Sequence, residues 1–141
     1  MHPLVKQLEG IFLAHLDRLA IELRQQYPGL TFTIWSTPTG TLTDYQGHDL
    51  GIECIFKRDS KTHAENVALM VEMCHLTSAP RLMGEVVWSQ GSDHSDTSWR
   101  EWRLMNEWPV ASQEAVSDLE STFPELISAY RKAVAQGASK C

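Results

Sequence analysis

The sequence lacks the features that mark several large classes of protein. It carries 12 Lys and Arg against 18 Asp and Glu, a formal net charge of −6, whereas nucleic-acid-binding proteins normally present a basic surface. No apolar run approaches the roughly 18 residues that a membrane-spanning helix needs. Glu9, His15 and Asp17 interrupt the apolar residues of the first segment, so no secretory leader is expected there. We therefore expect neither a nucleic-acid partner nor a membrane partner.

Cysteine is also scarce, and the motifs of common enzymes are missing. The chain has three cysteines, Cys54, Cys74 and Cys141, with no C-x-x-C pair. Two of them lie in apolar, strand-like runs, where a free thiol packs as a small apolar side chain. Reduced thiols are typical of a cytoplasmic protein. Because no phosphate-binding loop, G-x-S-x-G elbow or H-E-x-x-H motif is present, the sequence predicts no cofactor and does not indicate an enzyme.

The length and composition predict one ordinary globular domain. The chain has 141 residues, of which 43% are hydrophobic and 21% are charged. These fractions are typical of a folded chain, and the length suits a single domain. We expect this domain to span residues 1–136, followed by a frayed tail at 137–141, because Gly137 ends the last apolar pattern.

Hydrophobic periodicity predicts one helix followed by five strands. Apolar residues recur three or four apart from Leu4 to Tyr27 and stop at the Pro28-Gly29 pair, which predicts an N-terminal helix. Alternating patterns predict strands at 30–37, 50–57, 67–74, 82–88 and 99–108. Residues 66–76 also fit a helix, and that alternative stays open. Short connections favour antiparallel neighbours, so the sheet is predicted to be a meander.

The C-terminal part is predicted to form two helices. Ser112 is a suitable cap for the first of them. Thr122 then restarts the pattern, because Pro124 suits a first helical turn and Glu125 completes a capping box. The predicted fold is thus two-layer α+β: an N-terminal helix, a five-stranded antiparallel meander sheet and two C-terminal helices, with all helices on one face.

The two faces of the predicted sheet differ in composition. The face expected beneath the helices is apolar and comprises Leu50, Ile52, Cys54, Phe56, Val67, Leu69, Val71, Met73, Leu82, Val86, Trp88, Trp102 and Leu104. The opposite face mixes apolar and acidic residues and comprises Glu53, Ile55, Lys57, Met70, Glu72, Cys74, Met83, Glu85, Val87, Trp99, Glu101, Arg103 and Met105. Strict alternation places Trp99 and Trp102 on opposite faces.

Two interpretations of the mixed face remain open. It is either a solvated outer face, on which Glu53, Glu72 and Glu85 keep the sheet soluble, or a surface that binds a partner, since Met and aromatic residues are enriched at interface centres. In the second interpretation its methionines stay out of the interior, and a homodimer through this face is the simplest assembly. The candidate partner-binding residues are Glu53, Met70, Glu72, Met83, Glu85, Trp99, Glu101, Arg103 and Met105.

Two groups of polar residues are candidates for metal binding or acid–base chemistry. Asp93, His94 and Asp96 offer metal-ligand atoms within one loop, but their spacing fits no common metal motif, and turn residues are expected between strands. They are weak metal candidates. Glu72 and Glu85 form a candidate acid–base pair on neighbouring strands, which a cross-strand cation would neutralise. Cys74 and His75 are adjacent in a strand and point to opposite faces, so they do not form a catalytic pair.

Three functions compete on these observations. The first is an acidic cytoplasmic protein-interaction module, such as an adaptor, a specialised chaperone or a toxin-neutralising protein, which binds a partner through the mixed face. The alternative is a small-molecule-binding protein with an apolar pocket between helix and sheet. The third, an enzyme that uses the Asp93–Asp96 loop or the Glu72/Glu85 pair, has the least support, because neither group shows a desolvated site.

Overall fold

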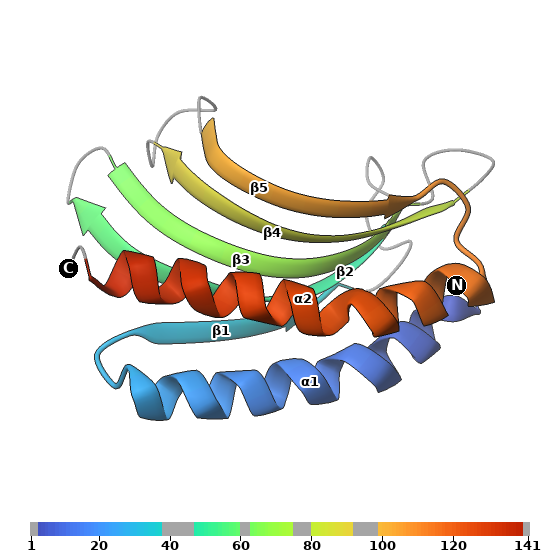
Figure 1. Ribbon diagram of the computed structural model, residues 1–141, viewed down its shortest axis with the longest axis horizontal. Helices are drawn as coiled ribbons and strands as arrows, with labels where there is room; N and C mark the ends of the chain where they lie inside the picture. Colours follow the sequence, from blue (N-terminus) through green and yellow to red (C-terminus); the bar gives the residue numbers. More distant parts are fainter. Residues whose placement is uncertain (1–2, 38–46, 60–62, 75–79, 92–98, 140–141) are drawn as a thin grey trace.

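The computed structural model describes residues 3–37, 47–59, 63–74, 80–91 and 99–139, and the side chains of 3–37, 48–56, 66–73, 80–88 and 106–139. These residues form an α+β fold in which both described helices lie on one side of a sheet (Figure 1). The elements are α1 (Leu4–Gln26), β1 (Thr31–Ser36), β2 (Gly47–Asp59), β3 (His63–Cys74), β4 (Arg81–Gly91), β5 (Trp99–Trp108) and α2 (Gln113–Ala138).

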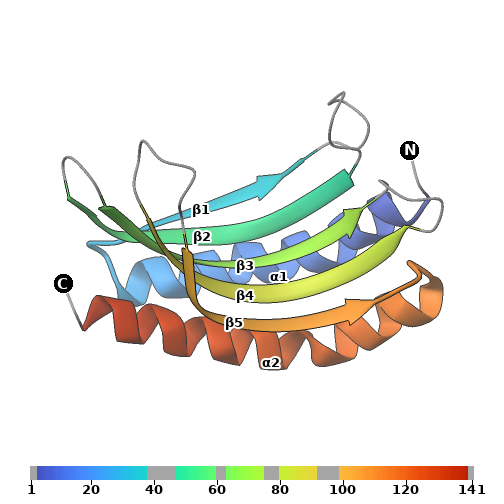
Figure 2. The same ribbon diagram turned by 90° about the horizontal axis from the view of Figure 1, so that it is seen from above.

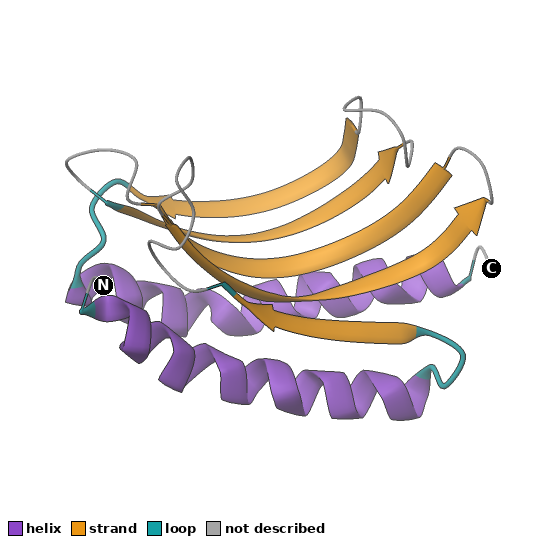
Figure 3. Cartoon of the chain, turned by 180° about the vertical axis from the view of Figure 1, so that it is seen from behind, coloured by secondary structure: helices purple, strands orange, loops and turns teal. Residues whose placement is uncertain are grey.

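The sheet is the predicted antiparallel meander. Its strands lie in the order β1-β2-β3-β4-β5, and every neighbouring pair is antiparallel. The helical alternative for residues 66–76 is wrong over the part described, since β3 continues to Cys74. The strands curve so that the face without helices is on the inside of the bend (Figures 1 and 3). Register shifts at Ile55/Lys57 and Trp88/Ser89 contribute to this curvature, because β-bulges bend the strand that carries them.

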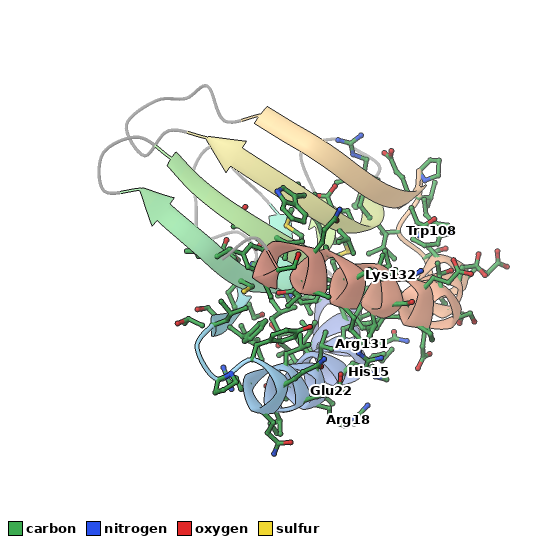
Figure 4. All side chains as sticks on the ribbon, turned by 60° about the vertical axis from the view of Figure 1, so that its left-hand side comes forward. His15, Arg18, Glu22, Trp108, Arg131 and Lys132 are labelled. Atoms are coloured by element: carbon green, nitrogen blue, oxygen red, sulfur yellow. The ribbon has the colours of Figure 1, made fainter. Side chains whose placement is uncertain are left out.

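The two helices run side by side in the same direction beneath the sheet (Figure 2). The first helix, α1, lies against β1 and β2, while α2 lies mainly against β3, β4 and β5. The side chains of Gln7 and Gln113 exchange hydrogen bonds near the start of both helices. Further along, Arg131 donates two hydrogen bonds, of 2.8 and 2.7 Å, to the Glu22 carboxylate (Figure 4). The helices therefore form one continuous layer.

The hydrophobic core lies between this layer and the inner face of the sheet. The inner-face residues predicted to be buried are buried throughout the described part of β2, β3 and β4, and Phe56 packs at the margin. From the helices, Phe12 and Phe123 meet in the middle of the layer, with ring centroids 4.8 Å apart. Each large side chain buried here contributes about 1.5–3 kcal/mol. Trp102 and Leu104 have side chains outside the described set.

The prediction of two C-terminal helices is wrong, because a single helix passes through Pro124. Ser112 caps it as expected, accepting a hydrogen bond from the amide of Ala115. A proline inside a helix costs about 3 kcal/mol, but Phe123 and Leu126 are buried on the same face of α2, one on each side of the proline. Packing of that continuous apolar face against the sheet outweighs the local start signal at Thr122.

The end of α2 also differs slightly from the expectation. The helix continues through Gly137 to Ala138, past the expected domain boundary at residue 136. Gly137 is buried against the ring of Phe56. A Cβ atom on Gly137 would lie 2.5 Å from that ring. A frayed tail stays a prediction, since residues 140–141 lie outside the described part. Neither described helix has the length and apolar character needed to cross a membrane.

Candidate functional site: the outer face of the sheet

A single row of paired residues crosses the outer face from one edge strand to the other. Successive strands pair Trp35 with Gly51, Gly51 with Met70, Met70 with Glu85, and Glu85 with Met105. Residues that pair directly across antiparallel strands share a face. We call this set the central row. It combines one aromatic residue, one position without a side chain, two methionines and one carboxylate.

Gly51 allows an aromatic ring to lie flat on the sheet. A Cβ atom at this position would come within 2.6 Å of the Trp35 ring, and it would also collide with the Leu69 carbonyl oxygen. The indole of Trp35 therefore covers bare backbone at the β1 end of the central row, where it is partly buried. Sequence analysis did not single out Trp35. The alternation of inward and outward residues, with Phe32 inward and Trp35 outward, could have identified it as an outer-face residue.

The outer face is buried along β4 although neither described helix covers it. Met83 is 9% exposed, and Glu85 and Val87 are each 3% exposed. The expectation that the methionines stay exposed is therefore wrong for Met83, while Met70 is only partly buried. The interpretation of Glu85 as a solvated carboxylate is also wrong.

Acidic side chains lie on both sides of the central row. Asp49 pairs across the strands with Glu72 on one side, and Glu53 pairs with Ala68 on the other. All three carboxylates are partly buried, and Asp49 Oδ1 is buried without a hydrogen-bond partner among the described residues. Like charges directly opposite each other are destabilising. The described part of this face therefore brings three carboxylates close to the central row.

One described ion pair lies at the margin of this face. The guanidinium of Arg81 is 3.1 Å from the carboxylate of Glu107, joining the start of β4 to the end of β5, and both side chains are substantially exposed. Such an exposed pair contributes about 0–1 kcal/mol.

Several predicted site residues have side chains outside the described set. The backbone register pairs Arg103 with Val87 and Met105 with Glu85, but the side chains of Trp99, Glu101, Arg103 and Met105 are not described. The register shift at Trp88/Ser89 leaves Glu101 without a pairing partner, so strict alternation does not hold between Trp99 and Trp102.

The weak metal candidates also lie outside the described residues. They are Asp93, His94 and Asp96. Within the described part of the chain, no group of three or more His, Cys, Asp or Glu side chains is arranged to hold a metal ion. The role of the loop stays a prediction.

A second polar cluster joins α1 to the sheet. His48 is fully buried, and its Nε2 lies 3.5 Å from Glu9 Oε1. The hydroxyl of Ser36 donates a 2.9 Å hydrogen bond to the same oxygen. This is not a nucleophile–base–acid chain, because Ser36 and His48 both face Glu9 rather than each other. Sequence analysis missed the cluster because it assigned His48 to a loop, whereas β2 already begins at Gly47.

A groove of about 480 Å³ runs along α2. The described residues that line it all belong to α2 and are Glu125, Ser128, Ala129, Lys132, Ala133 and Gln136. An apolar pocket between helix and sheet stays a prediction.

Comparison with known proteins supplies no family for this chain. It matches no protein-family model, and no curated protein matches it significantly. The functional argument therefore depends on the described residues of the outer face.

Proposed function

We propose that this chain is a small acidic cytoplasmic protein-interaction module, and that it binds a partner protein through the outer face of its sheet. One observation carries the proposal: apolar side chains gather around Glu85 on a face that neither described helix covers. Trp35 and Met70 are both partly buried there. An apolar area with a polar rim on a soluble domain is typical of a binding surface.

The residue types support a protein as the ligand. Methionine side chains are flexible and polarizable, so they adapt to an irregular partner surface. Tryptophan is among the residues that most often anchor a protein interface. Acidic groups around an apolar centre speed association with a basic partner through electrostatic attraction. Trp35, Met70 and the carboxylates beside them supply all three elements.

A different chain fits this face better than a second copy does. In a symmetric dimer through the outer face, the patch that carries Glu53, Glu72 and Asp49 would meet the same patch of the other copy. Like charges brought together in an interface cost several kcal/mol. The homodimer expected from the sequence is therefore the weaker form of this proposal.

Site-directed photo-crosslinking in the cells that make the protein tests the proposal. A photoreactive residue replaces Met70 on the outer face or, as the control, Glu125 on the exposed side of α2. We expect a discrete protein adduct from position 70 and none from position 125. The crosslinked protein is identified by mass spectrometry, and its binding is then measured by calorimetry.

A pair of charge-insertion variants sharpens the test. Ala68→Lys places a long side chain on the outer face, and Ser128→Lys does the same on α2. Binding should weaken at least about tenfold, which is 1.4 kcal/mol, in the first variant and stay unchanged in the second. Equal crosslinking at positions 70 and 125, or equal binding by both variants, would contradict the proposal.

A further inference from the structure

We infer that two copies of this chain pair through the open edges of their β1 strands, as antiparallel strands related by a two-fold axis at Ile34. The paired edges leave the outer face of both sheets uncovered, so this dimer and the proposed partner occupy different surfaces. The direction of the backbone groups of β1, two charged side chains of α1 and the position of α1 beneath the sheet support this pairing.

Alternate residues of β1 present their backbone N–H and C=O groups to the open edge of the sheet. The amide of Thr37 donates a 2.7 Å hydrogen bond to the Asp49 carbonyl oxygen, which continues the register of β1 with β2. Hydrogen-bonded and non-hydrogen-bonded pairs alternate along an antiparallel ladder. The odd-numbered residues of β1 therefore bond to β2, and the backbone groups of Phe32, Ile34 and Ser36 point away from it.

A hydrogen bond from α1 agrees with this direction. Arg24 Nη2 donates a 2.7 Å hydrogen bond to the Phe32 carbonyl oxygen, as expected for an oxygen directed away from β2. The outermost strand of the described sheet on this side is β1 (Figure 2), and no described residue outside the sheet bonds to the Ile34 backbone. An edge of unpaired N–H and C=O groups is a template for another strand.

Two charged side chains of α1 flank this edge and favour an antiparallel pairing of two copies. Arg24 lies at Phe32, and at the other end of the strand the Ser36 hydroxyl donates a 2.9 Å hydrogen bond to Glu9 Oε1. A two-fold axis at Ile34 sets Phe32 of one copy opposite Ser36 of the other. Each Arg24 then meets the Glu9 of the other copy. A parallel pairing would instead bring like charges together, which is repulsive.

The same axis pairs every edge-facing residue of β1. Ile34 lies opposite Ile34 of the other copy, and Phe32 lies opposite Ser36, so each backbone group that points away from β2 gains a partner. An axis at Thr33 would leave Ser36 unpaired within β1, and an axis at Trp35 would leave Phe32 unpaired. Hydrogen bonding and charge therefore select the same register.

The edge groups have the capacity for these additional partners. The Phe32 carbonyl oxygen has two lone pairs, so it accepts from Arg24 and from the new strand together. The Glu9 side chain is 40% exposed, and its contacts with Ser36 and His48 both use Oε1. A carboxylate accepts about four hydrogen bonds. The Arg24 guanidinium of the other copy can therefore bind Glu9 without displacing Ser36.

The position of α1 also allows the pairing. Because α1 lies against both β1 and β2, its axis runs beneath the space between them, about half a strand spacing inside β1. Across the new pair, the two α1 axes are therefore about two strand spacings apart, or about 9.6 Å. Packed helices lie about 8–10 Å apart. The two α1 helices would thus form a contact of their own beneath the joined sheets.

One charge on this side of α1 opposes the pairing. Asp17 lies two turns after Glu9 on the same side of the helix, and it is exposed. It falls midway between Glu9 and Arg24, so it approaches the same residue of the other copy at the two-fold axis. Asp17→Asn should therefore tighten the dimer by about two- to fivefold, and a looser dimer would contradict the register.

Light scattering of the full-length protein after size-exclusion chromatography measures the assembly. We expect a mass of twice the 15.9 kDa of one chain, with a dimer fraction that rises with protein concentration. A monomer at every concentration would overturn the inference.

Ile34→Pro blocks the edge without removing a hydrogen bond between β1 and β2. The lost N–H points away from β2, and edge strands tolerate proline at such a position. The dissociation constant of the dimer should rise at least about tenfold, and circular dichroism checks the fold. A dimer formed through the outer face would respond instead to Ala68→Lys and not to Ile34→Pro, which would also overturn the inference.

Charge exchange shows whether the two side chains meet between copies. Arg24→Glu and Glu9→Lys should each weaken the homodimer at least about tenfold, because like charges then meet across the axis. Mixing the two variants should restore a heterodimer, seen by native mass spectrometry, in which both pairs again have opposite charges. A role of either residue within one chain gives no rescue on mixing, so this test holds even if Ile34→Pro does not fold.

Matched controls complete the test. Lys132→Glu and Glu125→Lys make the same changes at exposed positions of α2, and they should leave the dimer unchanged alone and mixed. Folded Arg24→Glu and Glu9→Lys variants that form no heterodimer would overturn the inference. The crosslinking at position 70 is independent of this result: a dimer without an adduct contradicts the proposed function only, and an adduct on a monomer contradicts the dimer only.

Discussion

The two faces of β3 and β4 bury their side chains by different means. On the inner face, Leu69 and Val86 lie beneath two helices and have no exposed surface. On the outer face, Val87 and Glu85 are almost as inaccessible, at 3% each, yet no described helix covers them. Burial on the inner face comes from a second layer of structure, whereas neither described helix contributes to burial on the outer face.

Low side-chain exposure therefore has two different causes in the same sheet. A side chain beneath a helix layer is in a packed interior, where removing atoms leaves a cavity. A side chain on the outer face packs against neither described helix, and we expect its truncation to cost less free energy. Substitutions that act on the two faces separately test this interpretation.

The largest contrast is expected between the neighbours Leu69 and Met70 on β3. Leu69→Ala leaves a cavity in the core and should lower the free energy of unfolding by about 2–5 kcal/mol. Met70→Ala, on the partly buried outer face, should cost less than about 1 kcal/mol. Urea unfolding followed by circular dichroism measures both. Equal losses would show that the outer face is packed as tightly as the core.

Substitution of Pro124 tests whether a single continuous helix, α2, covers the inner face. Pro124→Ala restores an amide donor inside α2 and should raise the free energy of unfolding by about 1–3 kcal/mol. If residues 113–138 formed two helices with Pro124 in a first turn, the same substitution would give no gain. Thermal and urea unfolding distinguish the two cases. A stabilised variant confirms that one continuous helix covers the inner face.

The adjacent valines of β4 compare the two faces with the same chemical change. Val86→Ala should cost about 2 kcal/mol, the transfer of two methylene equivalents plus a cavity. Val87→Ala should cost about 1 kcal/mol, because neither described helix packs on that side. The difference is measured by denaturant unfolding under one set of conditions. If Val87→Ala cost as much as Val86→Ala, the outer face would be packed as tightly as the core.

The smallest effect is expected at Tyr130, whose hydroxyl lies in the core without a hydrogen-bond partner among the described residues. Burial raises the pKa of this hydroxyl, and the nearby Cys54 and Glu53 raise it further. Tyr130→Phe should therefore be nearly neutral or slightly stabilising at pH 7, because no hydrogen bond is lost.

The pH dependence of Tyr130 has a definite sign. The folded state holds the proton beyond the ordinary tyrosine pKa of about 10, so the contribution to stability is complete below pH 10 and decreases as the pH rises. At pH 11 the natural protein should have lost about 1.4 kcal/mol relative to Tyr130→Phe. Urea unfolding at pH 7, 10 and 11 measures the difference. Parallel pH profiles for the two proteins would contradict the assignment.

Much of the fold could be predicted from local patterns, but one such pattern gave the wrong result. Alternation identified the strands and the apolar face, because residues two apart in a strand share a side. At Pro124, by contrast, the capping pattern that begins with Thr122 indicated a helix start. The longer apolar spacing of Leu119, Phe123 and Leu126, all buried, was the stronger signal, because helix stability comes mainly from tertiary packing.

The sequence predicted which residues belong to the candidate site, but not how deeply each side chain is buried. Sequence alternation placed Glu53, Met70 and Glu85 on one face, and the register confirms that they share it. It did not reveal that Glu85 is buried while Glu53 is partly exposed. Burial depends on how neighbouring strands bend, and the bend depends on bulges that the alternation pattern does not show.

By itself, the sequence determined the order of the strands, their antiparallel pairing and the division of their residues between an apolar and a mixed face. These properties follow from the two-residue period of a strand and from the short connections between strands. Only the tertiary structure decided that one helix passes through Pro124, that Trp35 covers Gly51, and that the strands curve with the mixed face on the inside of the bend. Each of these depends on packing between residues distant in the chain, which local patterns do not encode.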